Sequence, residues 1–354
     1  TVAVREQINV QHALGTSHET SLALSFSLPE GPSLATIHRV AVDDGVALAK
    51  AFSPALLESL LAHKVAAFDE PVDLLVAGAD GGFVPMRGDG RAEREWHEGR
   101  VVTVTMLGAP DPDKPRQLSL FDEPRRWLDA GGQRRVLATV VLGQMPTLDG
   151  PRSDRVESAL KTAVTALTKV CPQARWQGLS DGGDWPEKVL DESVGRARRT
   201  TDFFHTSDHL KDAAEGRLGR GEEATAWWAE ERTALLTEPG AAQQLATTLA
   251  RDGERPGRCH DVDAVRREAG YVGKRVDTMA YAERLAANEV IGSGHTEAAI
   301  KQVITTRMKR TGANWSHRGG EAVMHARSLV VSGLWKGAWA AYVTPHEAPR
   351  QAAA

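Results

Sequence analysis

Apolar residues recur at helical spacing near the C-terminal end of the chain, at Ile300, Ile304 and Met308. This spacing gives a helix one apolar side that packs on a core. Ser293 is a favourable residue to precede a first helical turn, so we expect a helix that begins there and extends to about residue 311. Glu297 falls in its first turn, which predicts a carboxylate held on a rigid element.

Short apolar runs bounded by turn residues predict buried strands. The first run covers residues 72–79 and ends at Asp80, which two glycines follow; residues 83–86 and 100–107 continue the strands as a meander. An acid at the end of a buried strand is costly unless it is paired or binds a cation, so Asp80 is the first candidate site residue. The alternative is a plain turn residue without function.

A second acid follows a second strand. Residues 134–142 predict a strand, with a helix as the alternative, and residues 153–170 have the apolar spacing of a helix. Residues 175–180 then form a short strand that leads to Asp181, again before glycines. A helix that crosses from one strand to the next places the two strand ends close together, so we expect Asp181 to lie near Asp80.

After Pro186 the pattern is helical for about a hundred residues and offers no strand candidate. It predicts an all-α insertion between the second acid and Glu297. Asp202 and His205 form a D-x-x-H pair at the start of one of its helices, and both residue types bind metals. The neighbouring arginines and phenylalanines instead favour a structural or DNA-facing role for this pair. The other helices are expected at residues 222–236, 241–250 and 262–287.

Two stretches outside this pattern suggest partners. Residues 17–45 contain two short helix-like segments around a turn, which is the pattern of a helix-turn-helix or, without a DNA role, of a helical hairpin. Residues 109–125 are polar and rich in proline, which predicts an exposed loop. This loop contains Gln117-Leu118-Ser119-Leu120-Phe121, which resembles the bacterial sliding-clamp-binding motif, in which a Gln and two apolar anchors enter a groove. The alternative is that Leu118, Leu120 and Phe121 pack on their own domain.

The composition is that of a globular protein. With 354 residues, 41% of them apolar, the chain is long enough for two or three domains. The formal charge of −4 argues against a uniformly basic coat, so DNA contacts must come from local clusters, at Arg196, Arg198 and Arg199 and at residues 301–310. Two cysteines without a CxxC pair, no signal peptide and no run of membrane-span length predict a reducing, cytoplasmic compartment and no membrane partner.

The Glu297 helix lies in a basic part of the sequence. Residues 298–327 contain six Lys or Arg residues against one acid, Glu321. An acid inside a basic field suggests a metal ligand that works on a phosphate backbone. The alternative is a first-turn Glu that only favours the helix dipole, a placement worth roughly 0.3–1 kcal/mol.

Three carboxylates therefore stand out: Asp80, Asp181 and Glu297. Two-metal phosphoryl transfer needs acids that hold two ions roughly 3.5–4 Å apart, one of which activates the attacking oxygen while the other stabilises the leaving oxygen. Ligand sets made only of oxygen suit Mg²⁺ or Mn²⁺ rather than zinc.

At this point the sequence resembles the DDE-type bacterial insertion-sequence transposases, and among them the Kra group. The resemblance covers about residues 70–340. It rests on Asp80-Gly81 after a strand, Trp96-His97-Glu98, Asp181-Gly182-Gly183-Asp184-Trp185, Asp202-Phe203-Phe204-His205 with His209-Leu210, Met279-Ala280-Tyr281, and Ile291-Gly292-Ser293-Gly294-x-x-Glu297 with Arg307-Met308-Lys309-x-x-Gly312-x-x-Trp315. The last block is the most specific. His295 departs from the family pattern, where an apolar residue is usual, and the N-terminal part is short.

The resemblance implies an α/β fold with a ribonuclease H-like mixed-sheet core that an all-α insertion interrupts. It implies that Asp80, Asp181 and Glu297 bind two Mg²⁺ or Mn²⁺ ions, and that Asp202 and His205 lie near the site. The implied division of the chain is a helical N-terminal region (1–68), the first part of the core (69–190), the insertion (191–288), the last part of the core (289–345) and a tail (346–354).

The implied activity is transposition. Water would cut the phosphodiester at each element end, and the exposed 3′-hydroxyl would then attack target DNA. Lys301, Arg307, Lys309 and Arg310 would hold the backbone, while Trp315 would stack on a base or belong to the core. The implied partners are DNA at the nucleoid, further copies of the chain that hold two ends together, and the sliding clamp. The alternatives are a ribonuclease H-like nuclease that cuts without joining and a domesticated, non-catalytic DNA-binding protein.

Overall fold

The computed structural model describes residues 2–14, 34–87, 94–117, 127–145, 155–255, 257 and 259–351. The N-terminal helices are α1 (Val2–Leu14), α3 (Leu34–Ala51) and α4 (Pro54–Ala66). The sheet region follows with β1 (Leu74–Arg87), β2 (Arg94–Gln117), β3 (Trp127–Gln144), α5 (Arg155–Val170), β4 (Arg175–Ser180), α6 (Asp184–Ser193), η1 (Arg196–Arg198) and β5 (Arg199–Thr201).

A helical region comes next in the chain. It consists of α7 (Phe203–Leu218), α8 (Glu222–Thr237), α9 (Ala241–Gly253), α10 (Val262–Gly273), η2 (Val276–Thr278) and α11 (Tyr281–Ala286). The C-terminal part consists of α12 (Gly294–Ile300), the π-helical turn η3 (Lys301–Thr305), α13 (Thr306–Met308), α14 (His317–Val331) and α15 (Trp335–Gln351). The class is therefore α/β, as the sequence predicts.

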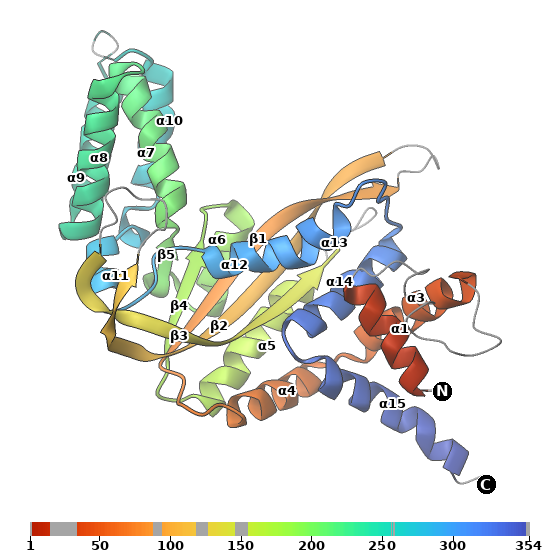
Figure 1. Cartoon of the computed structure of the whole chain (residues 1–354). Coiled ribbons are helices and arrows are strands. Elements are labelled where there is room, and N and C mark those ends of the chain that lie inside the picture. Colours follow the sequence, from red (N-terminus) through yellow and green to blue (C-terminus); the bar gives the residue numbers. More distant parts are fainter. Residues whose placement is uncertain are drawn as a thin grey trace.

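The five strands form one mixed sheet in the order β3-β2-β1-β4-β5 (Figure 1). β1 pairs antiparallel with β2, and β2 pairs antiparallel with β3. β4 lies parallel to β1 on its other side, and β5 lies parallel to β4. Helix α5 makes the crossover from β3 to β4, as the apolar spacing of residues 153–170 predicts.

Helices cover both faces of this sheet. Alternate residues of β1 point to opposite sides. Leu75 and Ala77 belong to a core that α4 and α5 close, whereas Val84 and Met86 belong to a core closed by α12, η3, α13 and α14. Because both faces are buried, residues 74–79 form a continuous apolar run without polar alternation. Figure 1 shows α12 and α13 lying across the face opposite to α5.

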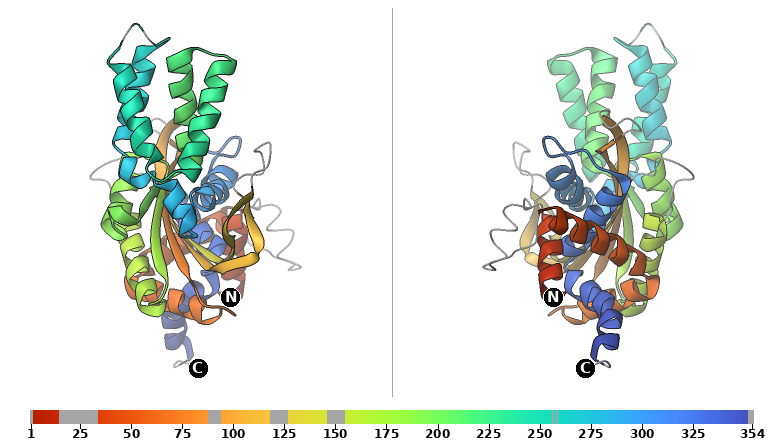
Figure 2. Two further views of the ribbon diagram at one scale, coloured as in Figure 1. Left: turned by 90° about the vertical axis from the view of Figure 1, so that its left-hand side faces the viewer. Right: turned by 90° about the vertical axis from the view of Figure 1, so that its right-hand side faces the viewer.

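The insertion has a hydrophobic core of its own. Residues of α7, α9, α10 and α11 share it, among them Phe203, Leu245, Val265 and Tyr281. In both views of Figure 2 these helices project beyond one end of the sheet. The expected helices at 222–236 and 241–250 are confirmed as α8 and α9, and the expected helix start at Asp202 is confirmed by its position as the N-cap of α7.

Two strands are longer than the sequence suggests. β1 does not end at Asp80 but continues through residues 83–86, because its pairing with β2 persists across the glycines, with Gly81 opposite Arg100 and Gly82 opposite Gly99. The expected strand end at Asp80 is therefore wrong. β2 likewise extends through residues 109–117, which were expected in a loop. It has register shifts against β3 there, and among the described residues no strand pairs with its other side beyond Leu107, so its prolines are tolerated.

The expectation that no strand follows Pro186 is also wrong. β5 is a strand of three residues beside β4, too short to show any periodicity. The helical insertion consequently begins at residue 202 and not at 191.

The N-terminal helices pack against the C-terminal part of the chain, with α1 and α3 both in contact with α14. The first segment of the expected helix-turn-helix lies outside the described residues, and the second is the start of α3. In the described ranges, no single helix has the length and apolar composition of a membrane span. The pair α3 and α4, bent by 91° at the break between them, has that length and composition only when the two helices are taken together.

Candidate functional site

The parallel pairing of β1 with β4 brings two of the predicted acids together. The last paired residues are Gly78 and Leu179. Continued by two residues, this register leads to Asp80 and to Asp181, which lies just past the end of β4, and the charge of Asp181 raises the pKa of Asp80. Asp80 is in phase with Val84 and Met86, the β1 residues that face α12, and Asp181 is in phase with Leu179, which faces the same side. Asp181 follows the end of β4, as predicted, whereas Asp80 lies within β1, so the proximity of the two acids comes from the pairing of these strands and not from two strand ends.

Backbone N–H groups hold both carboxylates. The N–H of Gly81 donates to Oδ1 of Asp80 over 2.6 Å, and the N–H of Gly183 donates to Oδ1 of Asp181 over 3.0 Å. Between Asp181 and Gly183, Gly182 has φ of +100°, a conformation that side chains other than glycine rarely adopt. The two glycines after Asp181 therefore shape a turn around its carboxylate.

Glu297 lies in the first turn of α12, as predicted. Ser293 occupies the N-cap position, but its side chain does not cap the helix backbone. Its hydroxyl instead donates to Oε1 of Glu297 over 2.8 Å. Ser293 therefore orients one oxygen of the Glu297 carboxylate. The Glu297 side chain is exposed, so it remains accessible to solvent.

The first turn of α12 approaches the sheet closely at Gly78. A Cβ on Gly78 would lie 2.0 Å from Oγ1 of Thr296, the residue before Glu297. The hydroxyls of Thr296 and Thr103 lie 3.0 Å apart and are buried, which joins α12 to β2. The absence of a side chain at position 78 is therefore what allows Glu297 to be carried over the strands that hold Asp80 and Asp181.

The electrostatics of Asp80 show that the acids share one region. Burial raises the pKa of Asp80, and the charges of Asp181, Glu297 and Glu98 raise it further. The hydrogen bond from the Gly81 N–H lowers it, and the resulting pKa is about 6. Among the described residues, none of the charges that shift this pKa is positive. A largely buried carboxylate beside other carboxylates, with no cation among the charges that act on it in the described residues, is a site that a metal ion would stabilise.

Glu98 approaches the group from the opposite side of the sheet. A Cβ on Gly81 would lie 2.3 Å from its Oε1, and Gly81 alternates with Asp80 along β1. Its effect on Asp80 is the smallest of the three carboxylates. Glu98 therefore adds negative charge but does not face α12 with the other acids.

The three acids fit hard cations by chemistry, since all their donors are carboxylate oxygens. Within the described residues, however, no three His, Cys, Asp or Glu side chains are already close enough to hold a single metal ion jointly. Asp80, Asp181 and Glu297 share one face without converging on a point. Side-chain rotation toward a bound ion would be needed, and Glu297 is the exposed member that has room to rotate.

Asp202 and His205 do not point to a common place. The carboxylate of Asp202 is buried and accepts the N–H of His205 over 2.7 Å, as a helix N-cap does. The imidazole of His205 is exposed, with its ring 4.9 Å from that of His209. His209 stacks on Tyr271, and the Tyr271 hydroxyl donates to the backbone oxygen of Asp181 over 3.3 Å. The insertion therefore contacts the site through Tyr271.

The predicted DNA-binding residues fall into two groups. Lys301, Lys309 and Arg310 are exposed. Arg307 instead donates from Nε to the backbone oxygen of His12 over 3.1 Å, and its guanidinium lies 4.9 Å from the ring centre of Trp315. Burial, with a smaller effect of nearby arginines, lowers the pKa of Arg307 to about 10.

Trp315 is part of the packing under α13. Its indole N–H donates to the backbone oxygen of Met308 over 2.9 Å, and its own backbone pairs with β1. This placement matches the core alternative that the sequence left open for Trp315.

The cluster at residues 196–199 is not a free basic patch. Arg199 is fully buried and bonds Glu187 and Asp191, each over 2.7 Å. Arg196 pairs with Asp277 over 2.6 Å. The expectation of a local DNA contact here is wrong for Arg199, because its charge is compensated inside the protein. Arg196 is exposed, and its charge is paired at the surface. Arg198 is exposed.

The clamp-binding peptide lies largely outside the described residues. Gln117 is the last residue of β2, where its backbone pairs with Trp127 of β3. Leu118, Leu120 and Phe121 come after it in the part of the chain that is not described. In the sequence, the rest of the peptide therefore comes between β2 and β3, the two strands of a long β-hairpin.

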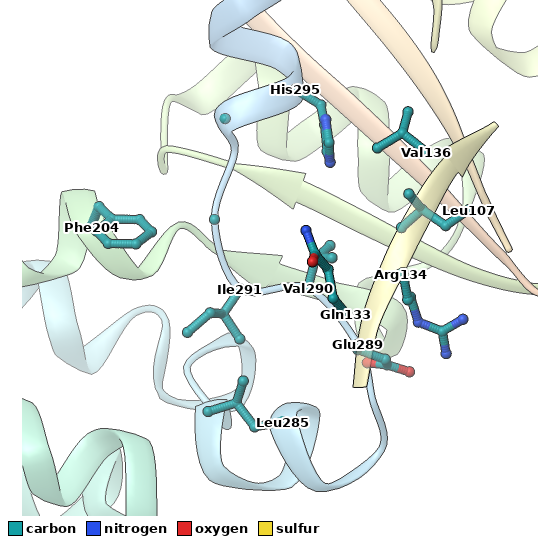
Figure 3. A pocket seen from close by; sticks show the side chains of 12 residues that line it. Leu107, Gln133, Arg134, Val136, Phe204, Leu285, Glu289, Val290, Ile291 and His295 are labelled. Carbon is teal, nitrogen blue, oxygen red and sulfur yellow. The ribbon is translucent and has the colours of Figure 1, made fainter. Parts of the chain in front are cut away.

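A pocket of about 340 Å³ opens beside the segment that leads to Glu297 (Figure 3). Its wall comes from β3 at Arg134 and Val136, from that segment at Ile291 and His295, and from Phe204 of α7. Burial lowers the pKa of His295 and so favours the neutral form of its imidazole. Sequence reasoning missed this pocket, since its residues come from distant segments that share no motif.

Comparisons with models of known protein families and with curated protein sequences give no match for this chain. The geometry of the acids and the motifs of the sequence are therefore the basis for a functional assignment.

Proposed function

We propose that this protein is a DNA transposase of the DDE type, which cleaves element ends and joins the 3′-hydroxyl to target DNA by two-metal phosphoryl transfer. The observation that carries the proposal is the placement of three acids that are distant in sequence. The parallel pairing of β1 with β4 brings Asp80 and Asp181 close together, and the charges of Asp181 and Glu297 both raise the pKa of Asp80.

The architecture supports the same proposal. A ribonuclease H-like core with an all-α insertion is what the resemblance implies. The chain has a mixed sheet, and a helical region with its own core separates the second acid from the third. A protein that only bound DNA would have no need to bury a carboxylate beside two others, because uncompensated negative charge opposes both folding and DNA binding.

The residues at the site would divide the work. Asp80, held by the Gly81 N–H, and Asp181, held by the Gly183 N–H, would offer their remaining oxygens to Mg²⁺ or Mn²⁺, and Glu297 would close the site from α12. Bound ions would supply an activated water or hydroxyl and stabilise the leaving oxygen. The protein itself contributes no nucleophile; it fixes the acids and holds the DNA backbone near them.

DNA would lie along the exposed side of α12 and α13. Lys301, Lys309 and Arg310 are exposed there and would contact phosphates. Synapsis of two element ends would require more than one copy of the chain, and the peptide after β2 would dock on the sliding clamp. These partners would place the protein at the nucleoid of the cytoplasm.

The test is cleavage and joining with a fluorescent DNA duplex that carries an element end, in the presence of Mg²⁺. Glu297→Gln is expected to abolish cleavage and to leave DNA binding unchanged. Glu223→Gln is the matched control, because Glu223 is also an exposed first-turn glutamate, on α8 of the insertion. Unchanged cleavage by Glu297→Gln would refute the site. Hydrolysis without joining of a pre-cut end would assign the site to a nuclease.

A further inference from the structure

Asp202 stands where three parts of the candidate site meet. It follows β5 directly, forms the N-cap of α7, and is only 1% exposed. A buried carboxylate is costly unless its oxygens are hydrogen-bonded, so its partners indicate why it is there.

Its backbone joins it to the strand that carries Asp181. The N–H of Asp202 donates to the backbone oxygen of Ser180 over 2.7 Å, and Ser180 immediately precedes Asp181. The end of β4 is thereby fixed to the residue with which the insertion begins.

Its side chain joins it to the segment that carries Glu297. One carboxylate oxygen accepts the backbone N–H of Ser293, while the other accepts the N–H of His205. The next residue, Phe203, adds a backbone bond from its N–H to the oxygen of Ile291 over 2.8 Å. Ser293 in turn donates its hydroxyl to Glu297. A continuous chain of hydrogen bonds therefore runs from Ser180 through Asp202 to the Glu297 carboxylate.

The same segment is also held by packing. A Cβ on Gly292 would lie 2.8 Å from the ring of Phe204, in the first turn of α7. The chain between Ile291 and Ser293 is thus pressed against α7, and no side chain separates the two.

We propose that Asp202 is a positioning residue that couples the insertion to the site. Its carboxylate binds the Ser293 N–H and its own N–H binds the Ser180 carbonyl, so Asp202 sets the distance between Glu297 and Asp181. This inference rests on the proposed function, because only that function makes Glu297 and Asp181 metal ligands. Its chemistry requires a carboxylate. Two backbone N–H groups converge on the side chain, and an amide has only one acceptor oxygen and would turn an N–H toward the other donor.

A simple capping role makes a different prediction. If Asp202 only caps α7, its replacement weakens that helix and nothing more, as at any other capped helix. Asp261 is a matched control, because it is the N-cap of α10 in the same insertion, where one side-chain oxygen accepts the N–H groups of Asp263 and Ala264.

The experiment compares Asp202→Asn with Asp261→Asn in the full chain. Hydrogen exchange of the amides of residues 291–297 is the first measurement, since it needs neither metal nor DNA. We expect faster exchange in Asp202→Asn and no change in Asp261→Asn. Equal exchange in wild type and Asp202→Asn would overturn the inference and leave the proposed function standing.

Binding of Mn²⁺ alone, followed by the loss of its free electron paramagnetic resonance signal, is the second measurement. Asp202→Asn is expected to weaken Mn²⁺ binding by about tenfold or more, the usual effect of removing a residue that orients metal ligands. The cleavage rate should recover at saturating Mn²⁺. A rate that stays low while Mn²⁺ affinity is unchanged would also overturn the inference. Absence of Mn²⁺ binding by the wild type, with exchange still faster in Asp202→Asn, would instead refute the proposed function.

Discussion

At the scale of single residues, the decisive property is the charge on Asp80. Its carboxyl is buried among other carboxylates, and burial is the first cause of a pKa near 6 where an isolated Asp has 3.8. The folded protein therefore holds a proton there between about pH 4 and pH 6 that the unfolded chain releases. The contribution of Asp80 to stability is therefore most favourable below that window and is lost as the pH rises through 6.

Asp80→Asn should remove this cost. In the absence of divalent ions at pH 8, we expect the variant to have a larger free energy of unfolding than the wild type, by about 1–3 kcal/mol, since each unit of pKa shift corresponds to about 1.4 kcal/mol. The difference should shrink toward pH 4. Urea unfolding at the two pH values measures it, with Asp208→Asn as an exposed control on α7. A variant less stable than the wild type at pH 8 would contradict the account of Asp80.

At this scale the sequence predicted much of the site. Asp80 and Asp181 could be found because each acid follows an apolar run and precedes glycines, and Glu297 because it falls in a helix first turn. The roles of Gly78 and Asp202 could not be found. Both depend on contacts between segments about 90 residues or more apart, Gly78 with Thr296 and Asp202 with Ser293, which leave no local pattern.

At the scale of elements, the site depends on how α12 packs on the sheet. Glu297 lies over the same face of the sheet as Asp80 because the first turn of α12 lies against Gly78, and because Val303 and Ile304 bury the continuing helix on that face. The helix was predicted from its apolar spacing, but it includes a π-helical turn at Lys301–Thr305 that the spacing does not reveal.

Gly78→Ala should displace α12. The new methyl group would overlap Oγ1 of Thr296 and lie 2.7 Å from Oγ1 of Thr103, so we expect a loss of about 1–3 kcal/mol in unfolding free energy, the usual effect of overpacking. Cleavage should fall more than DNA binding, because the displaced element carries Glu297. Thermal unfolding and the cleavage assay measure the two effects.

The control for this substitution is Gly294→Ala. Gly294 lies in the first turn of α12, the turn that contacts Gly78 through Thr296, and a Cβ on Gly294 would meet no atom within 4 Å. That change should be neutral or mildly stabilising. Equal behaviour of the two alanine variants would show that α12 does not depend on close approach at Gly78.

The strands show where local patterns fail. The sequence ended β1 at Asp80 because of two glycines, yet pairing with β2 carries the strand past them to Arg87. It missed β5 altogether, because three residues with a buried Arg199 do not look like a strand; Glu187 and Asp191, both on α6, make that burial tolerable. The helices at 153–170, 222–236 and 241–250 were predicted because their apolar spacing extends over several turns, whereas the expected helix at 262–287 is divided into α10, η2 and α11.

At the scale of the whole molecule, the insertion and the sheet have separate hydrophobic cores but share the edges of one site. Asp202 and Tyr271 are the insertion residues that reach Ser293 and Asp181. A substitution that destabilises the insertion should therefore change the positions of Asp181 and Glu297 before it unfolds the sheet.

The peptide after β2 offers a prediction about partners. Leu120→Ala with Phe121→Ala should abolish binding to a bacterial sliding clamp and leave the unfolding temperature unchanged, because we expect these side chains to dock outside their own domain. Surface plasmon resonance with immobilised clamp measures the binding. A double variant that still binds, or one that loses stability, would favour packing of the peptide on its own domain.

The central claim is that Asp80, Asp181 and Glu297 hold metal ions together. Its most direct test is a crystal structure of the protein with Mn²⁺, with anomalous scattering used to locate the ions. We predict two anomalous peaks roughly 3.5–4 Å apart, bounded by the three carboxylates, with the Glu297 side chain rotated toward them. Peaks elsewhere, or none among these carboxylates at saturating Mn²⁺, would contradict the account.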